Sequence, residues 1–309
     1  MPVPARSTSF ADLLDSRFKK IYNDQYTQLP DRVAEFYGVM SGSDSPTKDT
    51  MRFSQVGAFG DVPEFTGSVI YDDVNQGYDT TLTHVEYASG FQIERKLYDD
   101  ALYNIMDAKP RGLSTAYSRT RQGHAAGVFN NAFSRVTTWS TNTEALALCS
   151  NVHTTTAAGV STTVGFDNLS TGSLNAVNLA TSRILMRGWR DDRGNRISVS
   201  PDMIVIPPDL YAEAYEITQS QGKPDTANNN ANVHQGQYQV VDWEYLDDAN
   251  NWFLIDKTFQ KQFNIWSQRL EPEFAQVEDF DTLLGKWRLY VRYSMGHVDW
   301  RWVVGHQVA

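Results

Sequence analysis

A long amphipathic pattern between residues 111 and 136 limits the possible fold more than any other feature of the sequence. Its apolar residues recur at the i, i+3, i+4 spacing of one helix face, and Pro110 and Gly112 mark the expected start. At about 1.5 Å per residue, such a helix would be about 37 Å long. We therefore predict one long helix with a basic surface, whose arginines are Arg111, Arg119, Arg121 and Arg135.

A period of two residues near the C-terminus predicts a long strand. Apolar residues from Trp287 to Met295 alternate with charged or polar neighbours. We expect this strand to pair with residues 263–274 or with the strand that leaves an earlier hairpin. Between residues 173 and 255, helical patterns alternate with short apolar runs such as 203–206, which indicates an α/β region.

The front of the chain predicts an arm and a hairpin. Residues 10–26 form an amphipathic helix with little to pack on in its own segment, so it must dock on the main body or on another chain. Residues 51–95 are typical of a β-hairpin, with one arm around 65–71, the other around 85–93, and a turn at 72–78. Residues 53–85 contain five acidic residues and no Lys or Arg. A two-stranded ribbon is marginal alone, so this acidic hairpin needs a surface to lie on.

Composition excludes several classes of protein. The 309 residues carry 27 Lys and Arg against 37 Asp and Glu, a net charge of −10, so the chain lacks the global basic footprint of a nucleic-acid-binding protein. Its single cysteine, Cys149, excludes an internal disulfide and a cysteine-based zinc site. The sequence has no run of 18 apolar residues and no apolar signal core, so we expect no membrane span and synthesis in the cytosol.

A search for catalytic patterns gives only weak candidates. The sequence contains no nucleophile elbow, phosphate-binding loop, zinc-protease motif or dinucleotide fingerprint. Isolated groups fit solvated or structural roles better than chemistry. These groups are the pair His297 and Asp299, the buried-type Cys149, half a calcium loop at Asp191, Asp192 and Asn195, and the acidic cluster Glu271, Glu273, Glu278, Asp279 and Asp281. We therefore predict no enzyme activity, no catalytic or metal-binding residues and no cofactor.

The order of these parts resembles the major capsid protein of tailed double-stranded DNA bacteriophages, which has the Hong-Kong-97 type fold. Residues 118–133 look like the spine helix of Mu-like head subunits. Residues 169–174, 191–197 and 201–210 are similar to the helix–strand–helix of the axial domain in that family. Residues 240–246 with 252–254 are similar to the axial-domain strands that follow. The strand at 286–304 is similar to the family's closing strand.

The resemblance implies an α+β fold with named parts. These are an N-terminal arm (1–50), an extended β-hairpin loop (51–92), a peripheral domain with the spine helix (93–168 and 266–309) and an axial α/β domain (169–265). Some family members join a loop Lys to an Asn of a neighbouring subunit. Residues 53–92 contain no Lys, so we expect a non-covalent shell. The family's N-terminal scaffolding segment is also missing, so we expect a separate scaffold or an earlier cleavage.

The resemblance further implies a function and partners. The chain would self-assemble, as hexamers and pentamers, into the icosahedral head shell around a phage genome of double-stranded DNA. The implied partners are portal and scaffolding proteins, with room for a decoration protein. The shell would make weak, non-specific contact with the packaged DNA, and the virion would be assembled in the bacterial cytoplasm. Two alternatives stay open: an encapsulin-like nanocompartment shell, and a β-rich enzyme or carbohydrate-binding protein with a single deep pocket.

One hypothesis about assembly follows from charge. The acidic hairpin of one copy would lie over the basic helix of a neighbour, with aromatic residues as anchors and charges setting register and encounter rate. The residues expected at this contact are Asp61, Glu64, Phe65, Tyr71, Asp72, Asp73, Tyr78, Asp79, Phe91, Arg111, Arg119, Arg121 and Arg135.

Overall fold

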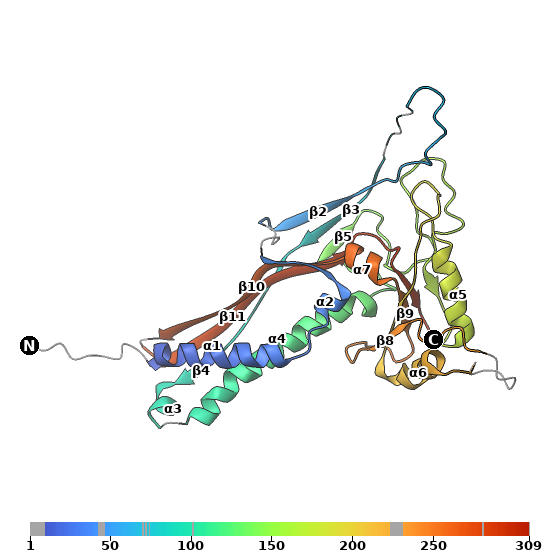
Figure 1. The fold of residues 1–309 in the computed structure, drawn as a ribbon. Coiled ribbons are helices and arrows are strands. Elements are labelled where there is room, and N and C mark those ends of the chain that lie inside the picture. Colours follow the sequence, from blue (N-terminus) through green and yellow to red (C-terminus); the bar gives the residue numbers. More distant parts are fainter. Residues whose placement is uncertain are drawn as a thin grey trace, which may run out of the picture.

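A long four-stranded sheet forms the body of the molecule (Figure 1). The computed structural model describes residues 10–42, 47–69, 71, 73, 75–100, 102–222, 231–279 and 281–308. Both pairings expected for the alternating strand are confirmed, because it lies between its two candidate partners. In sheet order the strands are β1 (Gly38–Met40), β10 (Asn264–Asp279), β11 (Leu284–His297) and β4 (Val85–Glu94).

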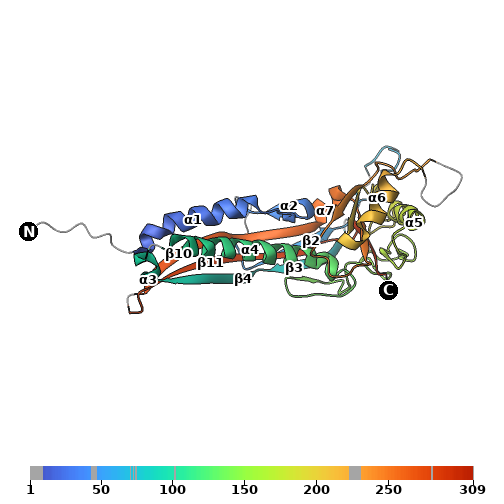
Figure 2. The ribbon, with the colours of Figure 1, turned by 90° about the horizontal axis from the view of Figure 1, so that it is seen from below.

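Two parallel helices, α1 (Phe10–Gln28) and α4 (Tyr103–Asn130), cover one face of this sheet (Figure 2). The arm helix α1 docks on the chain's own body, with Phe18 fully buried and its ring 5.0 Å from that of Trp287. A salt bridge of 2.5 Å between Arg17 and Asp107 links the exposed edges of the two helices. Short helices, α2 (Val33–Phe36) and α3 (Arg95–Asp99), lead into and out of this layer.

The long helix differs from the prediction at both ends. It begins at Tyr103 rather than at residue 111 and ends at Asn130 rather than at 136, so Pro110 lies inside it. Met106, Pro110, Leu113 and Tyr117 are all buried, and their spacing puts them on one helix face. Burial of that face offsets the backbone hydrogen bond that proline cannot donate.

A five-stranded sheet forms the second part of the molecule. The predicted strand at 203–206 is confirmed as β7 (Met203–Ile206). Phe253 of strand β9 (Trp252–Ile255) packs on Phe129 near the end of α4, at 5.0 Å between rings. The sheet order is β6 (Leu169–Ser170), β12 (Val303–His306), β9 (Trp252–Ile255), β7 and β8 (Gln239–Asp242), and the helices here are α5 (Ala176–Arg187), η2 (Pro208–Leu210), α6 (Tyr211–Gln219) and α7 (Lys257–Phe263).

The closing strand is interrupted, contrary to the prediction of one strand over 286–304. Strand β11 ends at His297, and β12 starts at Val303 in the other sheet, antiparallel to β9. A turn at residues 299–302 separates them, in which Asp299 accepts a hydrogen bond from the Arg301 backbone. The chain therefore crosses between the two sheets at this turn.

The hairpin prediction was also wrong in its pairing. Strand β2 (Thr50–Val56) pairs with β3 (Gln76–Thr83), and β5 (Ser140–Asn142) completes a three-stranded sheet. The described residues of 65–71 form no strand, because Gly67 has a positive φ of 112° and no strand lies beside the segment. Residues 85–93, expected as the second arm, lie in β4 and pair with β11 instead.

Candidate functional site

The loop between β2 and β3 projects away from the rest of the molecule (Figure 1). We call residues 57–75 the projecting loop; residues 70, 72 and 74 within it lie outside the part the structure describes. Phe65 is 72% exposed and Tyr71 is 92% exposed. Such a group of exposed apolar side chains marks an interaction surface in a folded protein. The other exposed apolar residues in and beside the loop are Val56, Phe59, Val62 and Val69.

The base of the projecting loop is fixed to its own chain. Gly57 donates a backbone hydrogen bond of 2.8 Å to the Asn75 carbonyl. The Ala58 backbone donates one of 2.8 Å to the Asp192 carboxylate, and the Arg193 side chain donates to the Asp73 carbonyl. The turn that resembles half a calcium loop thus holds the loop in place. The loop presents its apolar residues from an anchored base.

The predicted acidic and aromatic contact residues divide into two groups. Asp61, Glu64, Phe65, Tyr71 and Asp73 are exposed on the projecting loop, and Asp72 lies outside the described residues. The other three make contacts within the chain: Tyr78 hydrogen-bonds Thr154 at 2.6 Å, Asp79 forms an ion pair with Arg52, and Phe91 stacks on Trp287 at 5.4 Å.

The Arg52 guanidinium holds the pKa of Asp79 down at about 2, so this carboxylate stays charged and satisfied in the lone chain.

The arginines predicted at the contact also fall into an exposed group and a single residue that is largely buried. Arg111, Arg119 and Arg135 are exposed, whereas the side chain of Arg121 is only 13% exposed. Arg121 lies 2.8 Å from the Asp31 carboxylate and donates a hydrogen bond to the Tyr26 hydroxyl. Its guanidinium also sits over the Trp266 ring, 5.4 Å from the centroid. Arg121 therefore fastens the arm to the body in the lone chain.

The opposite face of the four-stranded sheet carries no helix among the described elements (Figures 1 and 2). Buried Trp287, Leu289 and Val291 point toward α1 and α4, so the residues between them point the other way. Lys286 and Arg288 are exposed there, and Arg292 pairs with Asp49 at 2.6 Å. We call this surface the open sheet face. The hairpin β2–β3 and the projecting loop lie on the same side of the sheet as this face (Figure 1).

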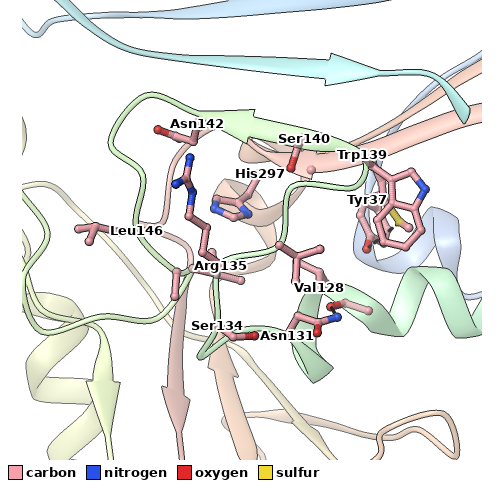
Figure 3. Close-up of a pocket in the computed structure, with 16 residues that line it drawn as sticks. Tyr37, Val128, Asn131, Ser134, Arg135, Trp139, Ser140, Asn142, Leu146 and His297 are labelled. Atoms are coloured by element: carbon pink, nitrogen blue, oxygen red, sulfur yellow. Dashed lines mark hydrogen bonds between the residues drawn. The ribbon is translucent and has the colours of Figure 1, made fainter.

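The pocket in Figure 3 lies between the end of α4, strand β5 and the end of β11. Tyr37, Val128 and Trp139 form apolar walls, and Arg135 and His297 also line it. Its volume is about 70 Å³, less than half of the roughly 150 Å³ that accommodates a benzene molecule. Burial lowers the pKa of His297 to about 4, so its ring is neutral at physiological pH.

The weak catalytic candidates have structural partners. Asp299 pairs with Arg301 at 2.9 Å, and Asp279 of the acidic cluster pairs with Lys286 at 2.8 Å. Burial raises the pKa of the Cys149 thiol, which keeps it protonated and unreactive. The described residues contain no group of three or more His, Cys, Asp or Glu that could hold a metal ion. Among the same residues, no helix combines the length and the hydropathy needed to cross a membrane.

Sequence reasoning missed most of the apolar surface of the projecting loop. Val62 is 96% exposed, and neither Val62 nor Phe59 was expected at a contact. Apolar alternation at 65–71 indicated a half-buried strand, which hides the exposure of these side chains. Gly60, Pro63 and Gly67, three strand-breaking residues within eight positions, were the available signal for a loop.

Comparison with known proteins gives one family match. A family model described as "Phage capsid protein" matches residues 77–305. No curated protein is similar enough in sequence to be matched.

Solved structures share the fold at low sequence identity. The cyanophage Pam1 capsid asymmetric unit has a TM-score of 0.54 and 11% identity, with 89% of this chain and 91% of that chain covered. The bacteriophage JBD30 capsid has a TM-score of 0.52 and 15% identity, covering 80% of this chain and all of that chain (100%). The capsid of an empty GTA particle has a TM-score of 0.52 and 12% identity, covering 91% of each chain.

Proposed function

From the premise that this chain belongs to the phage capsid protein family and has the Hong-Kong-97 type fold, we propose how it builds a head shell. It is a major capsid protein, a structural component of the virion. The family match does not favour the nanocompartment alternative. In our proposal the shell is icosahedral, is built from hexamers and pentamers, and encloses the double-stranded DNA of a tailed phage.

The projecting loop supports self-assembly most directly. Each large aromatic side chain buries about 150–250 Å² when it is fully covered, and Phe65 and Tyr71 leave most of this area exposed in the lone chain. A neighbouring copy that covers the loop recovers that hydrophobic free energy. The described part of the loop has carboxylates at Asp61, Glu64 and Asp73, and Lys is absent from the whole of it. We therefore propose a non-covalent contact with a surface that is partly basic.

The open sheet face is the docking place that we propose for this loop. Subunits of a single-layered shell are related by rotations about axes perpendicular to it, so the same side of every copy faces outward. The loop and the open sheet face lie on one side of the molecule, and α1 and α4 lie on the other (Figure 1). Arg288, exposed on the open sheet face, is thus a better partner for the loop's carboxylates than Arg111 or Arg119 on α4.

The finer parts of the assignment are also proposals. We propose that residues 1–50 act as the arm, 51–92 as the extended loop, 93–168 with 266–309 as the peripheral domain, and 169–265 as the axial domain. Strand β12 from the last segment joins the sheet of the axial domain, so the two domains share it. We propose scaffolding and portal proteins as partners, with room for a decoration protein, weak contact with DNA, assembly in the bacterial cytoplasm and no catalytic role.

Particle formation by the purified chain tests the proposal. Light scattering and electron microscopy should show closed particles for the wild type, and the double variant Phe65→Ala/Tyr71→Ala should yield mainly folded, unassembled protein. The double variant Val152→Ala/Val164→Ala is the control, because it removes exposed apolar side chains elsewhere. Normal particle yield from the loop variant would refute the role of the loop.

A further inference from the structure

Two helices over the five-stranded sheet expose large apolar side chains on their outer surfaces. On α5, Val177 is 61% exposed and Ile184 is 73% exposed. Their spacing of seven residues puts both on one helix face, about 10 Å apart along the axis. On α6, Tyr211 and Tyr215 are 48% and 57% exposed, one turn apart. Each helix therefore has an outward apolar stripe.

The two stripes lie among charges of opposite sign. Helix α5 contains Arg183 and Arg187 and no acidic residue. The segment formed by η2 and α6 contains Asp209, Glu213 and Glu216 and no Lys or Arg. Arg187, Asp209 and Glu216 are all exposed. We call these two surfaces the basic α5 face and the acidic α6 face.

The sheet topology places the two faces on opposite flanks of the same layer. Ser182 of α5 hydrogen-bonds His306 of β12 at 2.7 Å, so α5 lies over the β6–β12 side of the sheet. Helix α6 connects β7 to the edge strand β8 and packs beside β8. Helix α5 lies in the connection from β6 to β7, and α6 in the connection from β7 to β8, so both connections advance in the same direction along the sheet. Connections of this kind between parallel strands are right-handed, which puts both helices on the same face of the sheet.

Alternate residues of β9 show that this face is turned away from the long helix. Trp252 stacks on His306 on the α5 side, while its neighbour Phe253 packs on Phe129 of α4. Successive strand residues point to opposite faces, so α4 covers one face of the sheet and α5 the other. The outer faces of α5 and α6 therefore point away from α4, toward the side where another copy can approach.

We propose that the basic α5 face of one copy packs on the acidic α6 face of the next, and that this repeated contact closes copies into a ring. The two faces differ in charge and in side chains, so the contact is heterologous. A heterologous contact produces a closed ring when the rotation that relates one copy to the next divides a full turn evenly. Ile184 and Val177 supply aliphatic surface to Tyr211 and Tyr215, while the charges fix which face meets which. The inference rests on the proposed function, since it specifies one interface of the same shell.

Reversal of charge on each face separately, and then on both together, tests the inference. The α5 variant is Arg187→Glu, and the α6 variant is Asp209→Lys/Glu216→Lys. Arg183 is left unchanged because its side chain interacts with Tyr238 within the chain. Glu213 is left unchanged because it has a contact within the chain. We expect each variant alone to lower particle yield at least tenfold, and the combined variant to restore it to within about twofold of wild type. Circular dichroism and thermal unfolding confirm that every variant is folded.

Two comparisons separate this inference from the proposed function. Reversal of two exposed cations on α1, Lys19→Glu/Lys20→Glu, is the matched control and should leave ring formation and particle yield unchanged. If the wild type assembles and each reversal variant assembles equally well, the ring contact is refuted while the shell function stands. Failure of the folded combined variant to regain particles also refutes it, because two faces that meet must tolerate exchange of sign. If the wild type itself never assembles, the proposed function fails.

Discussion

At the scale of single residues, His306 connects the five-stranded sheet to α5. Its ring nitrogens lie 2.9 Å from the Gly172 carbonyl and 2.7 Å from the Ser182 hydroxyl, and its ring stacks on Trp252. Burial lowers the pKa of His306 to about 4 from its ordinary value of 6.5. The unfolded chain therefore binds this proton more readily than the folded one, and acid favours unfolding.

We predict that the free energy of unfolding decreases as the pH falls from 6.5 toward 4. His306 alone contributes up to about 3 kcal/mol to this loss, since one pKa unit corresponds to about 1.4 kcal/mol. Urea unfolding at several pH values should show a clearly shallower decrease for His306→Gln. The slope does not vanish in the variant, because the pKa of His297 is also lowered to about 4. If the decrease in unfolding free energy with falling pH is the same in the variant and the wild type, His306 does not contribute to the acid sensitivity.

We predict that glycine-to-alanine substitution has opposite effects on stability at two positions, Gly305 and Gly112. A Cβ atom on Gly305 would lie 2.6 Å from the Cys149 sulfur and 2.8 Å from the Phe133 ring. Gly305→Ala should therefore destabilise the protein by about 1–3 kcal/mol, the usual cost of overpacking. Gly112 lies in α4 with nothing within 4 Å of its added Cβ, so Gly112→Ala should stabilise by about 0.5–1 kcal/mol. Chemical denaturation of both variants measures the two signs, and equal signs would contradict the packing argument.

At the scale of elements, sequence patterns identified segments better than their boundaries and partners. The alternation from Trp287 to Met295 predicted β11 correctly, because it has a buried face against α1 and α4. The same kind of alternation at 65–71 failed, because alternation does not reveal whether a partner strand exists. Pro110 misplaced the start of α4, since a local rule about proline omits the tertiary burial of Met106 and Leu113.

Docking of the arm predicts a local effect of one core substitution. Phe18 is fully buried, with its ring 5.0 Å from Trp287 and 5.9 Å from Phe91. Phe18→Ala should weaken docking of α1 by about 3 kcal/mol or more, the usual cost of removing a buried phenyl ring. Amide hydrogen exchange should then accelerate by about a hundredfold in α1 and remain unchanged in β7 and β9. Lys19→Ala, at the exposed neighbouring position, is the control; uniform acceleration everywhere would mean that α1 unfolds only with the whole molecule.

At the scale of the whole molecule, charge alone does not show which residues are available for contacts between copies. The acidic run at 53–85 includes the projecting loop, for which we propose a contact role. Within the same set of predicted contact residues, however, Asp79 pairs with Arg52 and Phe91 stacks on Trp287 in the lone chain. Arg121 likewise holds the arm through Asp31. Which charges remain available depends on contacts between segments far apart in sequence. The side of the sheet on which the loop emerges depends on topology, which no local pattern encodes.

Salt separates the roles of charge and apolar surface in assembly. Exposed charges steer encounter and are screened by salt, whereas burial of Phe65 and Tyr71 is not screened. We predict that raising NaCl from about 0.05 M to about 0.5 M, where the Debye length falls from roughly 14 Å to roughly 4 Å, slows shell growth severalfold in stopped-flow light scattering. Preformed particles should resist the same change, since apolar contacts hold them.

The loop variant Asp61→Asn/Glu64→Gln gives the matching test of this division. It keeps every apolar side chain of the projecting loop, so its particles should be as resistant to dilution as those of the wild type. It loses two steering charges, so its growth should be slow at low salt and nearly insensitive to added salt. Particles that form at the wild-type rate but dissociate on dilution would reverse the roles, because the carboxylates would then hold the shell together rather than guide its formation.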